Sequence, residues 1–202
     1  MTNQAIFASA SAASTPLTVD GQQIPFLFRK EIIHLPASLL IGKSVTYPIA
    51  KQGVEGPDAN PPLSLLWDQC RRDGTFELLK ARAGTINLEG TLGLYYEINK
   101  DNSGNFSYLV GVLMDADTTV PEGFTSLAIP ESDVAVCWYK YHDGDDIWGV
   151  AHGTVVQYMA GQGYEGIPDT GWCSEFYPFG DGEYKAQTGW NVLGYMIAGR
   201  RK

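Results

Sequence analysis

Strand patterns flank one helical pattern in the first half of the chain. Apolar residues recur every three or four positions over 63–72, which predicts a helix, and Pro61 and Pro62 suit its first turn. Strands rich in Ile, Leu and Val are predicted at 28–35, 39–47, 92–98 and 106–114. The turn residues of 101–104 predict a hairpin between the last two of these strands.

The second half of the chain repeats this arrangement. Strands are predicted at 125–129, 134–141, 173–178 and 191–198. A helix with an apolar stripe is predicted over 147–158, where Asp145 or Asp146 can cap its first turn. Gly161 and Gly163 suit the end of that helix. Both halves therefore predict one helix among several strands.

Four short matches occur in the same order in the two halves. They pair Leu35-Pro36-Ala37-Ser38 with Ile129-Pro130-Glu131-Ser132, Trp67 with Trp148, Glu97 with Glu175, and Gly111 with Gly194. Their drifting offsets are those expected of loops that differ in length. We therefore expect an α+β fold of two strand–helix–strand–strand modules, at about 26–115 and 124–198, related by a pseudo-twofold axis. The sheet is expected to be antiparallel, with the helices on one face.

Composition bounds the class of protein. The chain has 202 residues, of which 44% are hydrophobic, so we expect a single domain over 26–202. Residues 1–25 are rich in Ala, Ser and Thr, which favours a mobile N-terminal arm. Ala8-Ser9-Ala10 imitates an export cleavage site, but no positive start precedes it, so export is only an alternative.

Charge and cysteine content restrict the classes of binding partner and the cellular compartment that we expect. A formal net charge of −9 argues against direct binding of nucleic acid, since phosphate contacts need Lys and Arg. No apolar run reaches the roughly 18 residues of a membrane span. The three cysteines, Cys70, Cys137 and Cys173, lack close spacing and are expected to be free thiols in a reducing, cytoplasmic compartment.

Several runs of residues resemble one known family. They are 106–112 (Phe-Ser-Tyr-Leu-Val-Gly-Val), 120–124 (Val-Pro-Glu-Gly-Phe), Ile129-Pro130, Val134-Ala135-Val136, Gly163-Tyr164 and Glu175-Phe176-Tyr177-Pro178. Together they resemble the GyrI-like small-molecule-binding domain. That domain also forms the effector-binding part of some AraC-type and MerR-type transcription activators, and it occurs in integron-cassette drug-binding proteins. The resemblance implies a duplicated module with a ligand groove between the halves. The arm and the loops 163–173 and 180–189 depart from the family pattern.

Glu175 is the leading candidate for a ligand contact. In the resembled family, the glutamate before an aromatic-Tyr-Pro stretch lies at the floor of the groove and faces a positively charged ligand. The alternative is a glutamate that points to solvent from a strand, the usual place of this residue type. Aromatic candidates for the groove walls are Tyr96, Tyr108, Phe124, Trp138, Trp172 and Tyr177. Trp67 and Trp148 lie on helical stripes and are expected in the core.

The charge distribution agrees with a cationic ligand. From Tyr141 to Gly199 there are eight acidic residues and one basic residue, Lys185. Such an imbalance attracts cations, although a solvated acidic surface explains it equally well. The segment 142–146 lacks the ligand series of a calcium loop, and the cysteines and histidines show no spacing that favours catalysis. No metal and no cofactor are expected.

The sequence therefore predicts a stand-alone binding protein for hydrophobic, aromatic and cationic small molecules. It would sequester a drug or toxin, or sense an effector for a separate regulator. One alternative is a hydrolase acting on electrophilic cyclopropane natural products, an activity that the resemblance includes. Glu175 would then be the general base and Tyr96 or Tyr177 a hydrogen-bond donor. The other alternative is a protein-inhibiting module that docks on a basic partner.

Overall fold

The computed structural model describes residues 2–52, 54–56, 59–82, 87–98, 100–167 and 172–202. The chain forms two compact units. Unit 1 consists of Met1–Pro36 and Pro130–Lys202, and unit 2 consists of Ala37–Ile129. Within the described residues, no helix has the length and apolar character needed to cross a membrane.

Unit 1 is built on four antiparallel strands in the order β3-β8-β11-β10. Their bounds are Leu27–Leu35 for β3, Ser132–Tyr141 for β8, Cys173–Pro178 for β10 and Asn191–Arg201 for β11. A short strand, β9 (Tyr164–Gly166), pairs with the end of β11. Residues 168–171, part of the loop that departs from the family pattern, lie outside the described residues.

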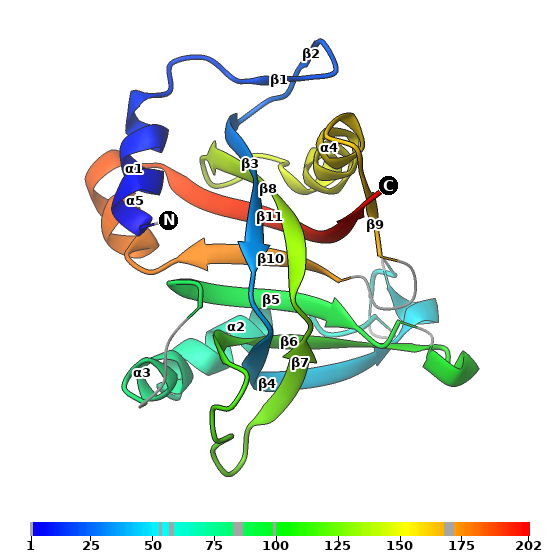
Figure 1. Cartoon of the computed structure of the whole chain (residues 1–202). Coiled ribbons are helices and arrows are strands. Elements are labelled where there is room, and N and C mark those ends of the chain that lie inside the picture. The colour runs from blue at the N-terminus through cyan, green and yellow to red at the C-terminus, as the bar shows by residue number, and fades with distance from the viewer. Residues whose placement is uncertain (1, 53, 57–58, 83–86, 99, 168–171) are drawn as a thin grey trace. The chain divides into compact units, whose positions relative to one another are not determined.

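Helix α4 (Trp148–Gly161) covers one face of the unit 1 sheet. Ala151, Val155 and Met159 pack in the same buried cluster as Cys137 and Tyr139 of β8. Figure 1 shows α4 beside β9, close to the C-terminal end of the chain. The face of the sheet that α4 covers is called the α4 face below. Trp148 is 47% exposed, so the expectation that it lies in the core is wrong.

The N-terminal segment folds against unit 1. Helix α1 (Asn3–Ala12) is followed by the small hairpin of β1 (Thr18–Val19) and β2 (Gln22–Gln23). Phe7 of α1 stacks on Tyr184 of helix α5 (Asp181–Thr188), with ring centroids 4.8 Å apart. The sequence analysis describes residues 1–25 as a mobile arm, whereas Ile6 and Ala10 are buried here. Composition could not show this because the packing is tertiary.

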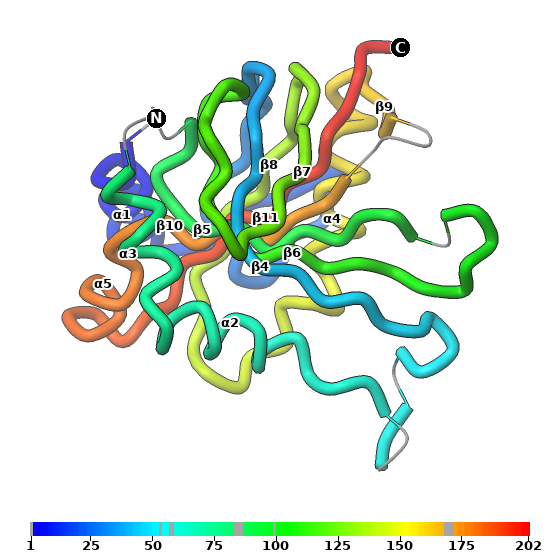
Figure 2. The backbone as a smooth tube through the Cα atoms, turned by 90° about the horizontal axis from the view of Figure 1, so that it is seen from below, coloured from blue at the N-terminus to red at the C-terminus, as the bar shows by residue number. Residues whose placement is uncertain are grey.

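Unit 2 has the strand order β5-β6-β4-β7. The bounds are Ser38–Pro48 for β4, Gly90–Tyr96 for β5, Asn105–Asp115 for β6 and Thr125–Ile129 for β7, with α2 at Ser64–Arg72, α3 at Thr75–Lys80 and short 3-10 turns at Ile49–Lys51 and Lys100–Asn102. Strands β4 and β6 run side by side as a long ribbon (Figure 2). Gly42 and Gly111 face each other there, where an added Cβ would collide with the opposite backbone. Their backbones can approach only without side chains.

The two units share one internal order of elements. In unit 2 the main elements follow one another as β4, α2 with α3, β5 and β6, and β7 is the fourth strand of the sheet. In unit 1 the corresponding elements are β8, α4, β10 and β11, and β3 is the fourth strand. The Pro36 and Pro130 links occupy equivalent places, each between two strands. Glu97, in contrast, lies in a left-handed turn after β5, whereas Glu175 lies inside β10. The α+β class and antiparallel sheet are confirmed, and the pseudo-twofold relation and the groove stay predictions.

Candidate functional site

Glu175 lies on the α4 face of the unit 1 sheet. It pairs with Tyr195 of β11, and Tyr195 in turn pairs with Cys137 of β8. Residues that pair directly across antiparallel strands point to the same face, so the three side chains share the face that α4 covers. Glu175 itself is half-buried.

Two tyrosines accompany this carboxylate. The Tyr177 hydroxyl donates a hydrogen bond of 3.1 Å to Glu175 Oε2. Tyr177 is also a hydrogen-bond partner of Tyr141, at the end of β8. Burial, and then the carboxylates of Glu175, Asp181 and Asp143, raise the pKa of Tyr141 to about 12. The phenol therefore stays neutral, chiefly because it is buried, and the three carboxylates act in the same direction.

The polar groups continue toward α4. His152 of α4 lies with its Nδ1 3.3 Å from the hydroxyl of Tyr195, and the two rings meet edge to face. Tyr195 also hydrogen-bonds the thiol of Cys173, whose pKa is raised by burial and by the charge of Glu175. We call the six residues Tyr141, His152, Cys173, Glu175, Tyr177 and Tyr195 the glutamate–tyrosine cluster. It combines one carboxylate with three phenols.

A cavity of about 350 Å³ adjoins this cluster. It is lined by His152, Val156, Met159, Gly166, Ile167, Trp172, Cys173, Ile197 and Ala198, so it shares His152 and Cys173 with the cluster. The lining is mostly apolar. Trp172 is 6% exposed, and its indole Nε1 has no hydrogen-bond partner in the described part of the chain. The cavity thus offers apolar and aromatic surface that meets the cluster at His152 and Cys173, and Glu175 lies two residues beyond Cys173 on β10 without lining the cavity.

The structure separates Trp138 from this cluster. Trp138 pairs with Gly194, one residue before Tyr195, so its side chain points to the opposite face of the sheet from Glu175. There its indole donates a 2.8 Å hydrogen bond to Glu31 and meets Phe176 edge to face. The strand register cannot be read from either strand alone, so the sequence does not distinguish the face of Trp138 from that of Glu175. Tyr177, by comparison, is bonded to Glu175, and Trp172 lines the cavity.

The other predicted aromatic residues belong to unit 2. Tyr108 is fully buried, and its hydroxyl accepts a 3.0 Å hydrogen bond from the Trp67 indole. Tyr95 shares its face, with ring centroids 4.8 Å apart, whereas Tyr96 points to the opposite face. Phe124 is half-buried near Lys43, whose ammonium lies 6.0 Å from the ring centroid. Tyr95 thus lies on the same side as Tyr108 and Trp67, and the place of Tyr96 in a groove wall stays a prediction.

Sequence reasoning missed three members of the cluster. Tyr141 and Tyr195 become neighbours of Glu175 only through the pairing of β8, β11 and β10. A signal for Tyr141 was present, because it ends a strand in alternation with Tyr139 and Cys137. His152 reaches the cluster from α4, and no spacing in the sequence links it to Tyr195. Among the described residues, no three acidic, His or Cys side chains are placed to hold a metal ion.

Comparison with models of known protein families identifies the family of this chain. The model of the GyrI-like small-molecule-binding domain matches residues 30–186. The chain belongs to the GyrI-like family. The match confirms the resemblance found in the sequence. It includes α4 and Glu175 but begins after α1 and the first residues of β3.

Solved structures of GyrI-like proteins share this fold. SAV2435 bound to tetraphenylphosphonium has a TM-score of 0.60 and 16% identity, over 85% of this chain and 94% of that chain. A putative transcription regulation protein from Staphylococcus aureus has a TM-score of 0.55 and 17% identity, over 85% and 98%. EcmrR in its complex with DNA has a TM-score of 0.57 and 15% identity, over 89% and 59%. No curated protein matches the chain in sequence.

Proposed function

We propose that this GyrI-like chain binds lipophilic cationic small molecules, with Glu175 as the counter-charge. The observation that carries the proposal is the half-buried carboxylate of Glu175, surrounded by Tyr177, Tyr141 and Tyr195 beside a mostly apolar cavity. A carboxylate removed from water favours a cationic partner. The faces of phenol rings attract cations as well, by roughly 0.5–2 kcal/mol each.

The charge of the protein supports the same ligand class. The chain carries a net charge of −9, and the carboxylates of Glu175, Asp181 and Asp143 add to burial in raising the pKa of Tyr141. A negative field raises the local concentration of cations and repels anions. The fold relative SAV2435 was solved with tetraphenylphosphonium, a lipophilic aromatic cation. At 16% identity this shows the fold alone, and it supplies the probe for the test.

The test compares two ions of equal shape and opposite charge. Calorimetric titration of the full chain with tetraphenylphosphonium is expected to give a micromolar dissociation constant, and tetraphenylborate is expected to bind far more weakly. Glu175→Gln keeps the size of the side chain and removes its charge. A charge-assisted contact contributes roughly 1.5–3 kcal/mol, so the variant should lose about tenfold to a hundredfold in affinity for the cation.

Glu97→Gln is the matched control. Glu97 is exposed and forms an ion pair with Lys100 in unit 2, so its loss should leave cation binding within about twofold. Equal affinity for the two tetraphenyl ions would reject the charge argument. Unchanged cation binding in Glu175→Gln would remove Glu175 from the site.

Such binding would sequester a toxic compound or report it to a separate regulator. The two roles differ in the second partner. A sequestering protein protects cells in proportion to its amount and needs no other chain. A sensor needs a regulator whose affinity for this chain changes when tetraphenylphosphonium is added, because an effector acts only through differential binding.

A second candidate function, hydrolysis, is favoured by one observation. The 3.1 Å hydrogen bond joins a carboxylate to a phenol; once a substrate takes over the single proton that Tyr177 donates to Glu175, Glu175 can accept a proton from water while Tyr177 donates to the substrate. In an electrophilic cyclopropane, the water oxygen would bond to a ring carbon as a ring carbon–carbon bond breaks. The conjugated carbonyl would take up the electron pair. Turnover that disappears in Glu175→Gln, with substrate binding kept, would identify the enzyme, and binding without turnover would exclude it.

A further inference from the structure

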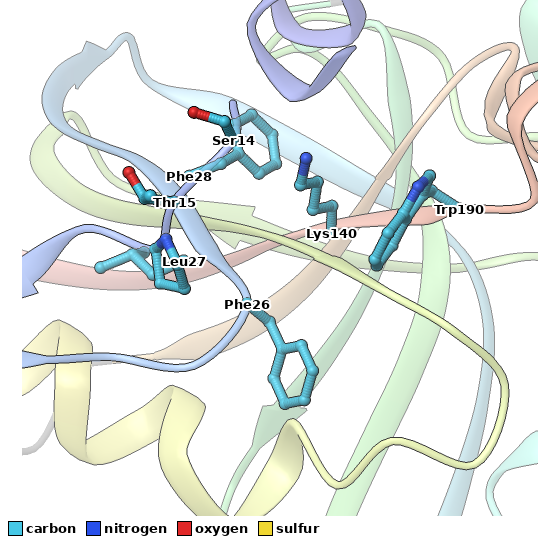
Figure 3. A pocket seen from close by; sticks show the side chains of 8 residues that line it. Ser14, Thr15, Phe26, Leu27, Phe28, Lys140 and Trp190 are labelled. Carbon is cyan, nitrogen blue, oxygen red and sulfur yellow. The ribbon is translucent and has the colours of Figure 1, made fainter. Parts of the chain in front are cut away.

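A second cavity lies where the N-terminal segment meets the start of β3. Its volume is about 200 Å³, and it is lined by Ser14, Thr15, Pro16, Phe26, Leu27, Phe28, Lys140 and Trp190. Figure 3 shows the indole of Trp190 beside the Lys140 side chain, with the Phe26 ring extending away from Lys140. The family model matches residues 30–186, so all of these residues except Lys140 lie outside the matched part. The cavity is therefore a feature that the family assignment does not explain.

Lys140 is the charged group of this cavity. Its ammonium donates to the backbone carbonyl oxygens of Ala10, at 3.0 Å, and of Ala13, which fix it at the C-terminal end of α1. It also lies 5.2 Å from the ring centroid of Trp190. In the described part of the chain, no carboxylate forms an ion pair with this half-buried ammonium. An ammonium has three N–H groups, so one of them is left for a ligand.

We propose that this cavity binds single-ring aromatic carboxylates. A cavity of about 150 Å³ holds benzene, so 200 Å³ fits one ring with a small substituent. The apolar side chains Phe26, Leu27, Phe28 and Pro16 suit the ring, and Lys140 suits a single negative charge. One ammonium held by carbonyl oxygens is too little positive charge for a phosphate ester, which usually meets several donors. A carboxylate is therefore the matching anion.

The cavity is independent of the glutamate–tyrosine cluster. Lys140 pairs with Val192, one position away from the pair of Tyr139 with Leu193, so its side chain points away from the α4 face. The proposal therefore stands whether or not Glu175 binds a cation. It also assigns opposite charge preferences to the two sites of unit 1.

The test uses three fluorinated probes on the full chain. Fluorine NMR titration compares 4-fluorobenzoate, 4-fluorobenzyl alcohol and 4-fluorobenzylamine, which share the ring and differ in charge. The benzoate is expected to bind with a dissociation constant on the order of 0.1–1 mM, the range for about ten heavy atoms in a preformed site. The alcohol should bind more weakly and the amine weakest. Binding of the benzoate should shift the indole N–H signal of Trp190, assigned with Trp190→Phe.

Two variants complete the experiment. Lys140→Met keeps the apolar stem and should weaken benzoate binding at least about tenfold while changing alcohol binding less than about twofold. Lys185→Met is the control, because Lys185 is bound to Asp143 and should leave the benzoate unaffected. Should Lys140→Met loosen α1, Lys140→Arg retains the charge and must still bind the benzoate. The proposal is overturned by equal affinity of the native protein for benzoate and alcohol, or by a shift at Trp172 alone.

Discussion

The hydroxyl of Tyr177 and the carboxylate of Glu175 form a hydrogen bond within one strand, two residues apart on the same face of β10. The contact restrains the Glu175 side chain through Oε2, and Glu175 Oε1 is not part of this hydrogen bond. Because each partner constrains the other, the geometry of the glutamate can be altered without changing its charge.

Tyr177→Phe should weaken tetraphenylphosphonium binding by about twofold to tenfold. The variant loses the hydrogen bond, which contributes roughly 0.5–1.5 kcal/mol, and retains the ring and the carboxylate. Calorimetric titration measures the change. Phe176→Leu on the opposite face is the control and should alter unfolding more than binding, since Phe176 packs against Trp138. Equal binding losses in both variants would point to a general disturbance of β10.

Two glycines are expected to respond in opposite directions to alanine. At Gly111 the new methyl group would collide with the Ile41 carbonyl oxygen, so we expect the free energy of unfolding to fall by more than about 3 kcal/mol. At Gly153, inside α4, an added Cβ meets nothing within 4 Å, and alanine should stabilise the helix by about 0.5–1 kcal/mol. Urea unfolding compares them. A stable Gly111→Ala would contradict the close β4–β6 approach.

The raised pKa of Tyr141 makes stability fall at alkaline pH. The unfolded phenol ionises near pH 10, whereas the folded phenol stays protonated until about pH 12. The unfolded state is therefore favoured progressively as the pH rises from about 10 to 12, and below pH 10 the contribution of Tyr141 is fully present. Tyr141→Phe should reduce this alkaline loss by about 3 kcal/mol at most, since each pKa unit corresponds to about 1.4 kcal/mol. Unfolding measured at several pH values, with phenolate absorbance as a second probe, gives the result.

The thiols should be unreactive while the protein is folded. Burial raises the pKa of Cys70 to about 11 and that of Cys137 to about 12, and the pKa of Cys173 is raised by burial first and by Glu175 as well. Because the thiolate is the reactive form, a thiol-specific dye at pH 8 should label all three slowly until denaturant is added. Tetraphenylphosphonium should slow Cys173 further. Fast labelling of Cys137 in the folded protein would contradict its burial.

Phe7→Ala tests the packing of α1. The stacked pair of Phe7 and Tyr184 should contribute roughly 0.5–1.5 kcal/mol in addition to the area it buries. We expect denaturant unfolding to shift accordingly, and Ser14→Ala, at an exposed position, to leave it unchanged. A Phe7→Ala variant as stable as the native protein would favour the mobile arm that the composition of residues 1–25 indicates.

Local patterns predict which segments form helices and strands better than they predict which of these elements lie next to one another. The helix expected over 63–72 is Ser64–Arg72, because its apolar spacing and its proline start are local signals. The sequence predicts a loop over 180–189, whereas the structure has helix α5 there, and the left-handed Gly189 that follows it is typical of a helix C-terminus. In the candidate site, Glu175 and Tyr177 could be paired because both lie on one strand.

The rest of the site depends on register, which a single strand does not encode. A shift of one residue moves a side chain to the other face of a sheet. For this reason Trp138 could not be told apart from Cys137 or Tyr139 as a neighbour of Glu175. The same limit explains the choice between Tyr95 and Tyr96. His152 adds a helix-to-sheet contact that only tertiary packing determines.

Unit 1 is made of segments from both ends of the chain, so its folding cannot be completed until the C-terminal segment has been synthesised. Strand β3 leaves the ribosome first, but its partner β8 begins about a hundred residues later. At about 5–20 residues per second, β3 and its apolar residues wait roughly 5–20 seconds for that partner. Unit 2, a continuous segment, is complete before then. During this interval the nascent chain carries a complete unit 2 and an unpaired strand β3 with exposed apolar residues. Chaperone binding to β3 is therefore most useful at this stage.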